Sequence, residues 1–379
     1  MIITCTYENF REALLFIESA TGKNSSLSII NNILIEATEN QLHFSATNLE
    51  IGVIKKIQAK IEQEGSIVVP INLLLNFLTA LRGEENIYLE LKENQLILKS
   101  GIHTTQINSY SAKDFPIIPQ STERNFLKFN LNNFKKIISK VFPFTSSLET
   151  RQELTGVLFK IENENIYTVA TDSFRLGENV IPVADLINEE SEIKLNEDNF
   201  IILPKQICLY INKISDSYKN VNCCIENNHL FIECEDLNIT AKLIDGNYPD
   251  YKQIIPQGSL TSLTVKKDEF IEALKVTTVF VGKDNKEIFF EINDKKMKIT
   301  TKQQETGSST TELSISMEGE NQEIALNPNY VLEGVRKIEE SEISIFINNK
   351  MTPVIFKGVD GGEVNEKFTY LVMPVKSVS

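Results

Sequence analysis

Histidine and cysteine, the side chains that most often bind zinc or form catalytic centres, are scarce in this chain of 379 residues. The three histidines, His43, His103 and His229, lie far apart, and the five cysteines include no CxxC pair. Isolated cysteines of this kind fit reduced, buried thiols better than a disulfide framework or a zinc site. We therefore expect neither a metal site nor a cofactor.

Long apolar runs are also missing. No stretch reaches the roughly 18 apolar residues that a membrane-spanning helix requires. The N-terminus lacks the basic region followed by an apolar region that is typical of a secretory signal. With 41% hydrophobic residues, the composition is that of a globular chain. We expect a cytoplasmic protein without a membrane partner.

Positive charge is in deficit. The chain has 38 lysines and arginines against 52 acidic residues, which gives a net charge of -14. A negative surface repels the phosphates of nucleic acids. This argument holds only if the charges are evenly spread, so the positions of the basic residues decide whether the chain can bind DNA.

One polar stretch raises the question of catalysis. The segment "TDSFRL", Thr171 to Leu176, places Asp172, Ser173 and Arg175 behind an alternating run. A nucleophilic serine needs a nearby base, and no histidine lies close in the sequence. The chain also lacks GxSxG, a phosphate-binding P-loop and a metal-binding motif. We therefore favour a turn in which Asp172 and Arg175 hydrogen-bond the backbone and each other, with an enzyme as the less favoured alternative.

An internal repeat organises the rest of the chain. A phenylalanine heads the first repeated helical pattern, at Phe10, Phe134 and Phe270. A second helical pattern carries a proline in its first turn, at Pro70, Pro204 and Pro328. Alternating runs broken by turn residues lie between and after these patterns and predict antiparallel hairpins. Each third of the chain is thus a helix, strands, a helix and strands, which predicts an α+β protein of three similar domains.

Two proline-containing segments separate the thirds. The segments Ser111 to Glu123 and Asp245 to Ser259 each carry an aromatic residue before a proline and a second proline further on. This composition favours extended, semi-rigid connectors over helices. We therefore predict domains at residues 1–122, 123–254 and 255–379.

The repeated helices carry basic residues. In "LNNFKKIISKVF", from Leu131 to Phe142, the apolar residues form one stripe and leave Lys136 and Lys140 on the opposite face. Further basic residues of the helical segments are Arg11, Arg82, Lys205, Lys213, Lys275, Arg336 and Lys337. Lysines on a helix face are usually only solvated. Six repeated helices with basic residues favour a function for them, and many of the acidic residues lie in turns instead.

Several motifs, in their order and spacing from Met1 to Lys376, resemble the bacterial DNA polymerase III beta subunit family, the beta sliding clamps. The motifs are "FSATNLEIGV", "KDFPIIP", "ETRQELTGVLF", "VATDSFRL", "LIDGNYPDYKQIIP" and the closing "YLVMPVK". No single motif decides the resemblance, because its strength lies in their arrangement over the whole chain.

The resemblance implies a non-catalytic ring. Two chains would join head to tail, with helices lining a hole that encloses duplex DNA, and with Ile107, Val279 and Phe280 at the contact. A basic lining and an acidic exterior would account for the net charge. The residues expected to face DNA are Lys23, Asn24, Arg82, Lys136, Lys140, Lys205, Lys213, Lys275 and Arg336. The chain departs from the family at Asn24, often an arginine, and at Gln152 and Glu153, where relatives can carry tyrosines.

The resemblance also implies a pocket for short linear motifs of the clamp loader, the replicative polymerase and repair proteins. Its residues would be Leu154, Thr171, Ser173, Phe174, Arg175, Leu176, Pro249, Gln253, Ile254, Met351, Pro353, Leu371, Met373, Pro374 and Val375. Apolar side chains would form a slot that excludes water, while Thr171 and Arg175 would offer hydrogen bonds to the bound motif. Phe174 stands where relatives commonly have histidine and Gln253 where they can have arginine, so we expect a shifted motif preference.

A three-domain scaffold that binds partners without encircling DNA remains the alternative among non-enzymes. The sequence feature that favours the clamp is the paired repeat of helices with basic faces, which a plain scaffold does not need.

Overall fold

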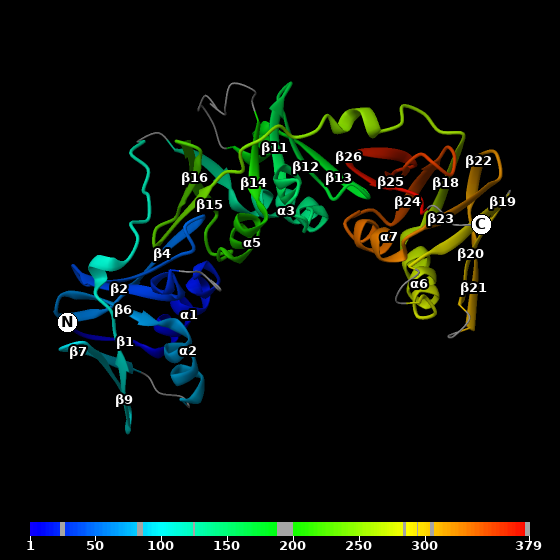
Figure 1. Ribbon diagram of the computed structural model, residues 1–379. Coiled ribbons are helices and arrows are strands. Elements are labelled where there is room, and N and C mark those ends of the chain that lie inside the picture. Colours follow the sequence, from blue (N-terminus) through cyan, green and yellow to red (C-terminus); the bar gives the residue numbers. More distant parts are fainter. Residues whose placement is uncertain are drawn as a thin grey trace. The chain divides into compact units, whose positions relative to one another are not determined.

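The computed structural model of the chain describes residues 1–22, 27–81, 86–123, 126–187, 200–282, 286–293, 295–303 and 307–375 (Figure 1). Within these ranges the helices are α1 (Tyr7–Ile17), α2 (Ile71–Ala80), α3 (Leu131–Val141), α4 (Val183–Leu186), α5 (Lys205–Lys213), α6 (Lys267–Thr278) and α7 (Pro328–Val335). The three predicted phenylalanines lie in α1, α3 and α6, and the second pattern forms α2, α5 and α7. Pro328 is the first residue of α7, whereas Pro70 and Pro204 end the preceding strands immediately before their helices.

Capping and acidic residues stabilise the starts of two helices, and an apolar stripe buries one face of α3. Thr6 caps α1 by accepting a hydrogen bond from the Asn9 amide, and Asp268 and Glu269 place negative charge in the first turn of α6. On α3 the apolar stripe Leu131, Phe134, Ile137, Ile138 and Val141 is buried, as predicted. Burial of this stripe supplies most of the stability of such short helices.

By density of internal contacts, the chain forms two compact units. Among the described residues, the first unit contains 1–132, 187 and 209–243, and the second contains 133–186, 200–208 and 244–375. The central third is therefore divided, because its strands join sheets with strands of the first third on one side and of the last third on the other.

The first unit has two sheets in the described part of the chain, both antiparallel. One has the order β5 (Lys60–Gln63), β1 (Ile2–Thr6), β7 (Asn86–Lys92), β8 (Gln95–Ser100), β9 (His103–Asn108). The other has the order β10 (Leu127–Asn130), β15 (Asn220–Glu226), β16 (His229–Glu233), β17 (Leu237–Lys242), β4 (Ile51–Gln58), β3 (Gln41–Thr47), β2 (Asn32–Thr38), β6 (Gly65–Pro70). The β4–β17 ladder, with Val53 opposite Ile239, links the first third to the central third.

The second unit also has two antiparallel sheets among its described residues. One has the order β14 (Phe200–Pro204), β11 (Gly156–Glu162), β12 (Asn165–Thr171), β13 (Arg175–Pro182), β26 (Glu363–Val372), β25 (Val354–Asp360), β24 (Glu342–Ile347), β18 (Thr261–Lys266), β22 (Ser316–Gly319). The other has the order β21 (Gly307–Ser314), β20 (Lys296–Gln303), β19 (Ile288–Asn293), β23 (Gln322–Leu326). The β13–β26 ladder, with Leu176 opposite Leu371, links the central third to the last third.

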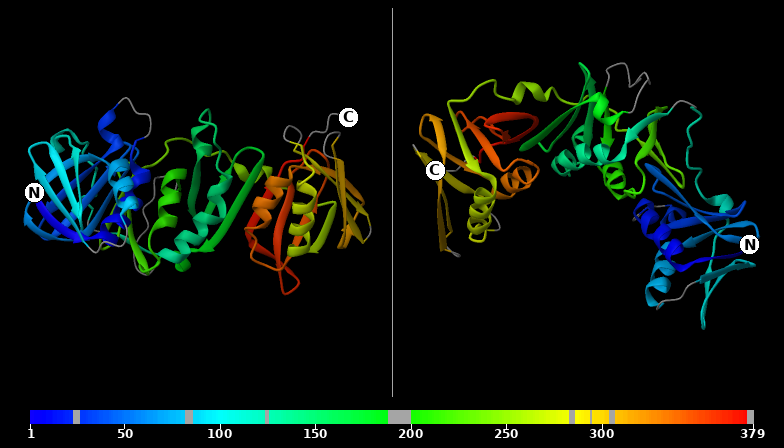
Figure 2. Two further views of the ribbon diagram at one scale, coloured as in Figure 1. Left: turned by 90° about the horizontal axis from the view of Figure 1, so that it is seen from below. Right: turned by 180° about the vertical axis from the view of Figure 1, so that it is seen from behind.

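Each unit has an aromatic core under its helices. In the first unit the Phe10 ring of α1 meets the Phe44 ring of β3 edge to face at 5.4 Å. In the second unit Phe270 of α6 packs against Phe290 and Phe356, and α6 lies beside α7 (Figure 2). The helices and the predicted antiparallel hairpins confirm the α+β class. The five cysteines are free; four are buried and Cys234 is half-buried.

Candidate functional site

The second unit contains a hollow of about 520 Å³ that collects most of the predicted pocket residues. It is lined by Thr171, Ser173, Phe174, Arg175, Leu176, Gln253, Ile254, Pro256, Met351, Thr352, Pro353, Leu371 and Met373. The lining comes from the β12–β13 turn, the segment around η6 (Tyr251–Ile254), the β24–β25 loop and the end of β26. Of the predicted residues, Leu154, Pro249, Pro374 and Val375 are not in this lining, whereas Pro256 and Thr352 are additions.

The β12–β13 turn is held by its own side chains. The Thr171 hydroxyl donates to the Arg175 carbonyl at 2.6 Å and accepts from the Ser173 amide at 3.1 Å. Asp172 Oδ1 accepts from the amides of Phe174 and Arg175, both at 3.0 Å. Ser173 adopts a φ of +75°, a strained conformation that this hydrogen-bonded frame supports. The predicted structural role of Asp172 in the turn is confirmed.

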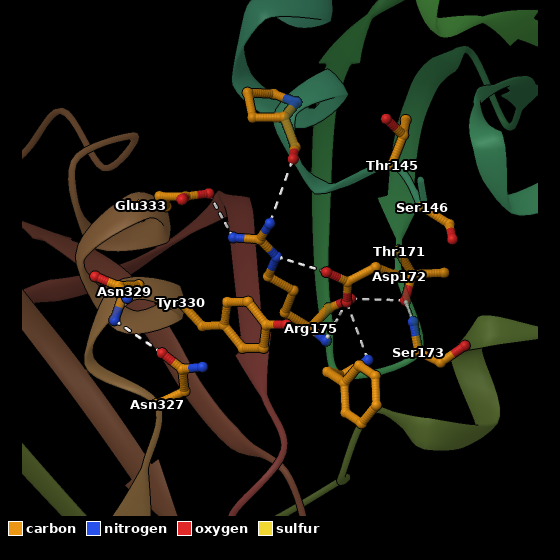
Figure 3. A network of polar contacts seen from close by, with 12 residues as sticks. Thr145, Ser146, Thr171, Asp172, Ser173, Arg175, Asn327, Asn329, Tyr330 and Glu333 are labelled. Carbon is orange, nitrogen blue, oxygen red and sulfur yellow. Dashed lines mark hydrogen bonds and ion pairs between the residues drawn. The ribbon is translucent and has the colours of Figure 1, made fainter. Parts of the chain in front are cut away.

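Arg175 is engaged within the protein (Figure 3). Its Nε donates to Asp172 at 2.9 Å, one terminal nitrogen donates to Glu333 of α7, and the other lies 3.5 Å from the Pro143 carbonyl. The guanidinium also lies over the Tyr330 ring at 4.4 Å. Burial by itself would lower the pKa of Arg175, but the hydrogen bond to Glu333 and the charge of Asp172 raise it above its ordinary value. The predicted hydrogen bond between Asp172 and Arg175 is confirmed, and the further contacts with Glu333 and Pro143 hold Arg175 in the wall of the hollow.

The hollow has a buried apolar floor and an exposed apolar rim. Leu176 and Leu371 are opposite each other in the β13–β26 ladder and belong to one buried cluster with Val169 and Ile355. Large apolar side chains on the rim remain exposed, namely Phe174, Ile254, Met351 and Met373. Exposed apolar groups around a concave site are typical of a surface that is covered by a partner.

The segment around η6 is tied to the sheet beside the hollow. Buried Glu178 of β13 accepts from the Tyr251 hydroxyl at 2.5 Å and pairs with Lys252 at 2.6 Å. Burial first, and then the charge of Glu178, raise the pKa of Tyr251, so this phenol stays protonated and donates. The anchoring fixes Gln253 and Ile254 at the hollow.

The first unit repeats the same turn between β3 and β4. Thr47 donates to the Ile51 carbonyl at 2.8 Å, Asn48 Oδ1 accepts from the amide of Ile51 at 2.8 Å, and Leu49 has a φ of +77°. Ile51 corresponds to Arg175 of the second unit. The next residue is Gly52 in the first unit and Leu176 in the second. A Cβ at Gly52 would come within 2.4 Å of Ile118 Cγ2, so Ile118 fills the corresponding space.

Ile118 belongs to a buried cluster with Val68 and Phe115. In the first unit, Ile118 of the segment "KDFPIIP" thus fills the space that corresponds to the hollow of the second unit. Ile118 lies far along the chain from the turn that it packs against. The local sign of this packing in the sequence is Gly52, which stands where the second unit has Leu176.

The residues expected to face DNA have varied surroundings. Lys136 and Lys140 each form an ion pair with Glu339 at 2.9 Å, and Lys213 donates to Ser19 Oγ at 2.8 Å. Within the described part of the chain, Lys205, Lys275 and Arg336 form no ion pair, and Lys275 and Arg336 are exposed. Lys23, Asn24 and Arg82 lie outside the described residues.

The residues expected at the contact between two chains lie near the edges of sheets or beyond a helix end. Ile107 lies on β9, an edge strand of its sheet, with its side chain buried inside the unit. Val279, directly after α6, is 75% exposed, and Phe280 is half-buried. Val279 is therefore the best placed of the three to contact another chain through its side chain.

A second hollow, of about 740 Å³, lies over the β19–β22 region and contains none of the predicted site residues. Its lining includes the ion pairs of Lys296 with Glu312 and of Lys298 with Glu291. Paired charges of this kind suit water better than an apolar partner. Elsewhere in the described ranges, no helix has the length and apolar character needed to cross a membrane, and no cluster of residues could hold a metal ion.

Models of the DNA polymerase III beta subunit match almost the whole chain. The N-terminal domain matches residues 1–119, the central domain 128–250 and the C-terminal domain 252–376. The beta sliding clamp of Vibrio cholerae is 25% identical over 362 residues, 95% of each chain, and that of Synechococcus elongatus is 24% identical over 99% of each.

Solved structures share the fold. The DNA polymerase sliding clamp of Bacillus subtilis has a TM-score of 0.90 at 23% identity, covering 100% of this chain and 99% of its own. The Pseudomonas aeruginosa clamp bound to griselimycin has a TM-score of 0.88 at 20% identity and full coverage of both chains. The fold is thus the three-domain α+β fold of the clamps. The chain belongs to the DNA polymerase III beta subunit family, the family of the beta sliding clamps.

Proposed function

We propose that this protein is a non-catalytic DNA sliding clamp that acts in the cytoplasm. Two chains close head to tail into a ring around duplex DNA, and the ring slides while it tethers the replicative polymerase, the clamp loader and repair proteins. The observation that carries the proposal is the apolar-rimmed hollow, built by four segments that are distant in the sequence, in a chain that matches the beta subunit over almost its whole length. Within this proposal the domains span residues 1–122, 123–254 and 255–379.

Two unpaired sheet edges support closure of a ring. Strand β9 ends one sheet of the first unit, and β21 ends one sheet of the second. The open backbone groups of an edge strand can pair with a strand from another chain. We assign Val279 to the contact through its exposed side chain, whereas buried Ile107 supports β9 from within.

The hollow supports the binding of short linear motifs. Its volume suits one or two anchor side chains of a peptide, which would be buried between Leu176, Leu371 and the exposed rim. Met351 and Met373 adapt their shape easily, so one site can accept motifs of several partners. Because Arg175 is engaged by Asp172 and Glu333, we expect recognition to depend on apolar contact more than on charge.

Topology and weak electrostatics would together keep the ring on DNA. Contacts between lysines and phosphates do not depend on base sequence, and non-specific dissociation constants are typically about 10⁻⁴ to 10⁻⁶ M at physiological salt. Binding this weak allows sliding, while the closed ring prevents escape from DNA without ends.

Retention on DNA tests the proposal directly. After loading by a clamp loader onto nicked circular DNA, we expect the protein to stay bound through gel filtration and to be lost once the circle is cut into a linear molecule. Equal retention on both forms would contradict an encircling clamp. Loss from both, with the hollow still binding motif peptides, would favour the scaffold alternative.

A further inference from the structure

One carboxylate in the second unit is held between two of the lysines expected to face DNA. Lys136 Nζ lies 2.9 Å from one oxygen of Glu339, and Lys140 Nζ lies 2.9 Å from the other. The two lysines are one helical turn apart on α3, and Glu339 follows α7. Two ammonium groups thus share one anion, each through its own oxygen.

The position of Glu339 is fixed by its surroundings. Lys267, at the start of α6, donates to the carbonyls of Ile338 and Glu339 at 3.0 and 3.1 Å. Lys140 also lies over the Phe368 ring at 5.7 Å. Burial would raise the pKa of Glu339, but the hydrogen bonds from Lys136 and Lys140 lower it, so the carboxylate is ionised at neutral pH. The hydrogen bonds from Lys267 therefore fix the backbone at Glu339, and its carboxylate reaches the two lysines from that fixed position.

Solvent and other anions can reach this group. The side chains of Lys136 and Glu339 are 55% and 52% exposed, whereas Lys140 is mostly buried. Exposed ion pairs add little to stability, so exchange of one anion for another has a low cost. A phosphate offers several oxygens to neighbouring lysines in the way that this carboxylate does.

We propose that Glu339 occupies the phosphate position of Lys136 and Lys140, so that DNA must displace it and the clamp holds the duplex less tightly than its lysines would allow. The inference rests on the proposed function, because it requires α3 to face DNA. During sliding, Glu339 returns to the lysines whenever a phosphate leaves them, which keeps the charge of the lysines compensated between contacts.

Glu339→Gln tests this competition. Without the carboxylate, both lysines become available to phosphates, and we expect affinity for a short duplex to rise on the order of fivefold at 0.1 M salt. The slope of log affinity against log salt should become steeper by up to about 0.9 for each lysine freed. Fluorescence anisotropy of a labelled duplex over a salt series measures both quantities.

Glu342→Gln is the matched control, because it also removes one negative charge. Glu342 lies three residues after Glu339, and its exposed side chain forms no ion pair within the described residues. Its affinity and slope should match those of the wild type. In a chain that also carries Lys136→Gln and Lys140→Gln, the Glu339→Gln change should have no further effect, since the effects of residues in one network are not additive.

The outcomes separate the inference from the proposed function. If the wild type binds the duplex in a salt-dependent way and Glu339→Gln behaves like Glu342→Gln, the carboxylate is only a structural tie and the inference is wrong. If the wild type shows no salt-dependent binding and is not retained on circular DNA, the proposed function itself fails. Should Glu339→Gln not fold, Glu339→Asp keeps the charge but shortens its reach, and an unchanged affinity in that variant would also overturn the inference.

Discussion

At the scale of single residues, the hollow divides its roles between groups that hold its shape and groups that a partner can cover. Arg175 holds the wall through Asp172 and Glu333, and Leu176 forms part of the buried floor. Met351 is different, because its side chain is 63% exposed on the rim. A substitution at Met351 therefore reports on binding with little effect on folding.

Met351→Ala should weaken the binding of an apolar peptide of the clamp-binding kind by about 1 kcal/mol, roughly fivefold, through lost apolar contact. A fluorescence anisotropy titration with a labelled peptide gives the affinity, and thermal unfolding confirms an unchanged fold. Leu148→Ala is the matched control, since Leu148 is 67% exposed in the same unit but lies outside the lining. Equal affinities in the two variants would place the peptide elsewhere.

Resemblance predicts most of the lining of the hollow, and the local sequence predicts the bond between Asp172 and Arg175, but not the contacts of Arg175 with Glu333 and Tyr330. The turn residues Thr171 and Asp172 are local, and their spacing already indicates a hydrogen-bonded turn. Glu333 and Tyr330 come from a helix far along the chain, and no local pattern connects them with Arg175. The local sequence therefore indicates only part of the set of contacts that holds Arg175.

At the scale of elements, a repeated turn gives a hollow in one unit and a filled core in the other. The structure has two similar turns, after β3 and after β12. The outcome differs because Gly52 leaves room that Ile118 fills. Packing between a connector and a sheet decides this, and such packing depends on volumes that periodicity does not encode.

Ile118→Ala should lower the free energy of unfolding by about 2 to 5 kcal/mol, because it leaves an apolar cavity beside Val68 and Phe115. The adjacent Ile117→Ala is the matched control. Ile117 is 94% exposed, so its loss should change stability by no more than about 0.5 kcal/mol. Urea unfolding followed by circular dichroism measures both. Similar midpoints for the two variants would show that Ile118 does not fill the core as described.

At the scale of the whole molecule, a chain with a net charge of -14 can still bind DNA if its basic residues share one surface. The sequence predicts the amphipathic character of α3, and burial of its apolar stripe confirms it. It does not reveal that Glu339 compensates Lys136 and Lys140, because that pairing is made by tertiary structure. The pairing of β4 with β17 and of β13 with β26 likewise carries sheets across the predicted connectors, which no local composition indicates.

Closure of the proposed ring depends on a contact between two chains, to which we assign Val279. Val279→Asp should yield monomers, because burying an unpaired carboxylate in an apolar contact costs several kcal/mol. The wild type should sediment near twice the 43.0 kDa chain mass at micromolar concentration. Since Val279 is largely exposed within one chain, the variant should keep its fold and its affinity for motif peptides.

Leu49→Asp is the control for this test, because Leu49 is another exposed apolar residue and aspartate tolerates its positive φ. This variant should remain dimeric, so that a loss of dimers in Val279→Asp reflects its position and not added charge alone. A Val279→Asp protein that sediments as a dimer would place the contact elsewhere. A wild type that stays monomeric at these concentrations would count against a stable ring, and the edges of β9 and β21 would then need another partner.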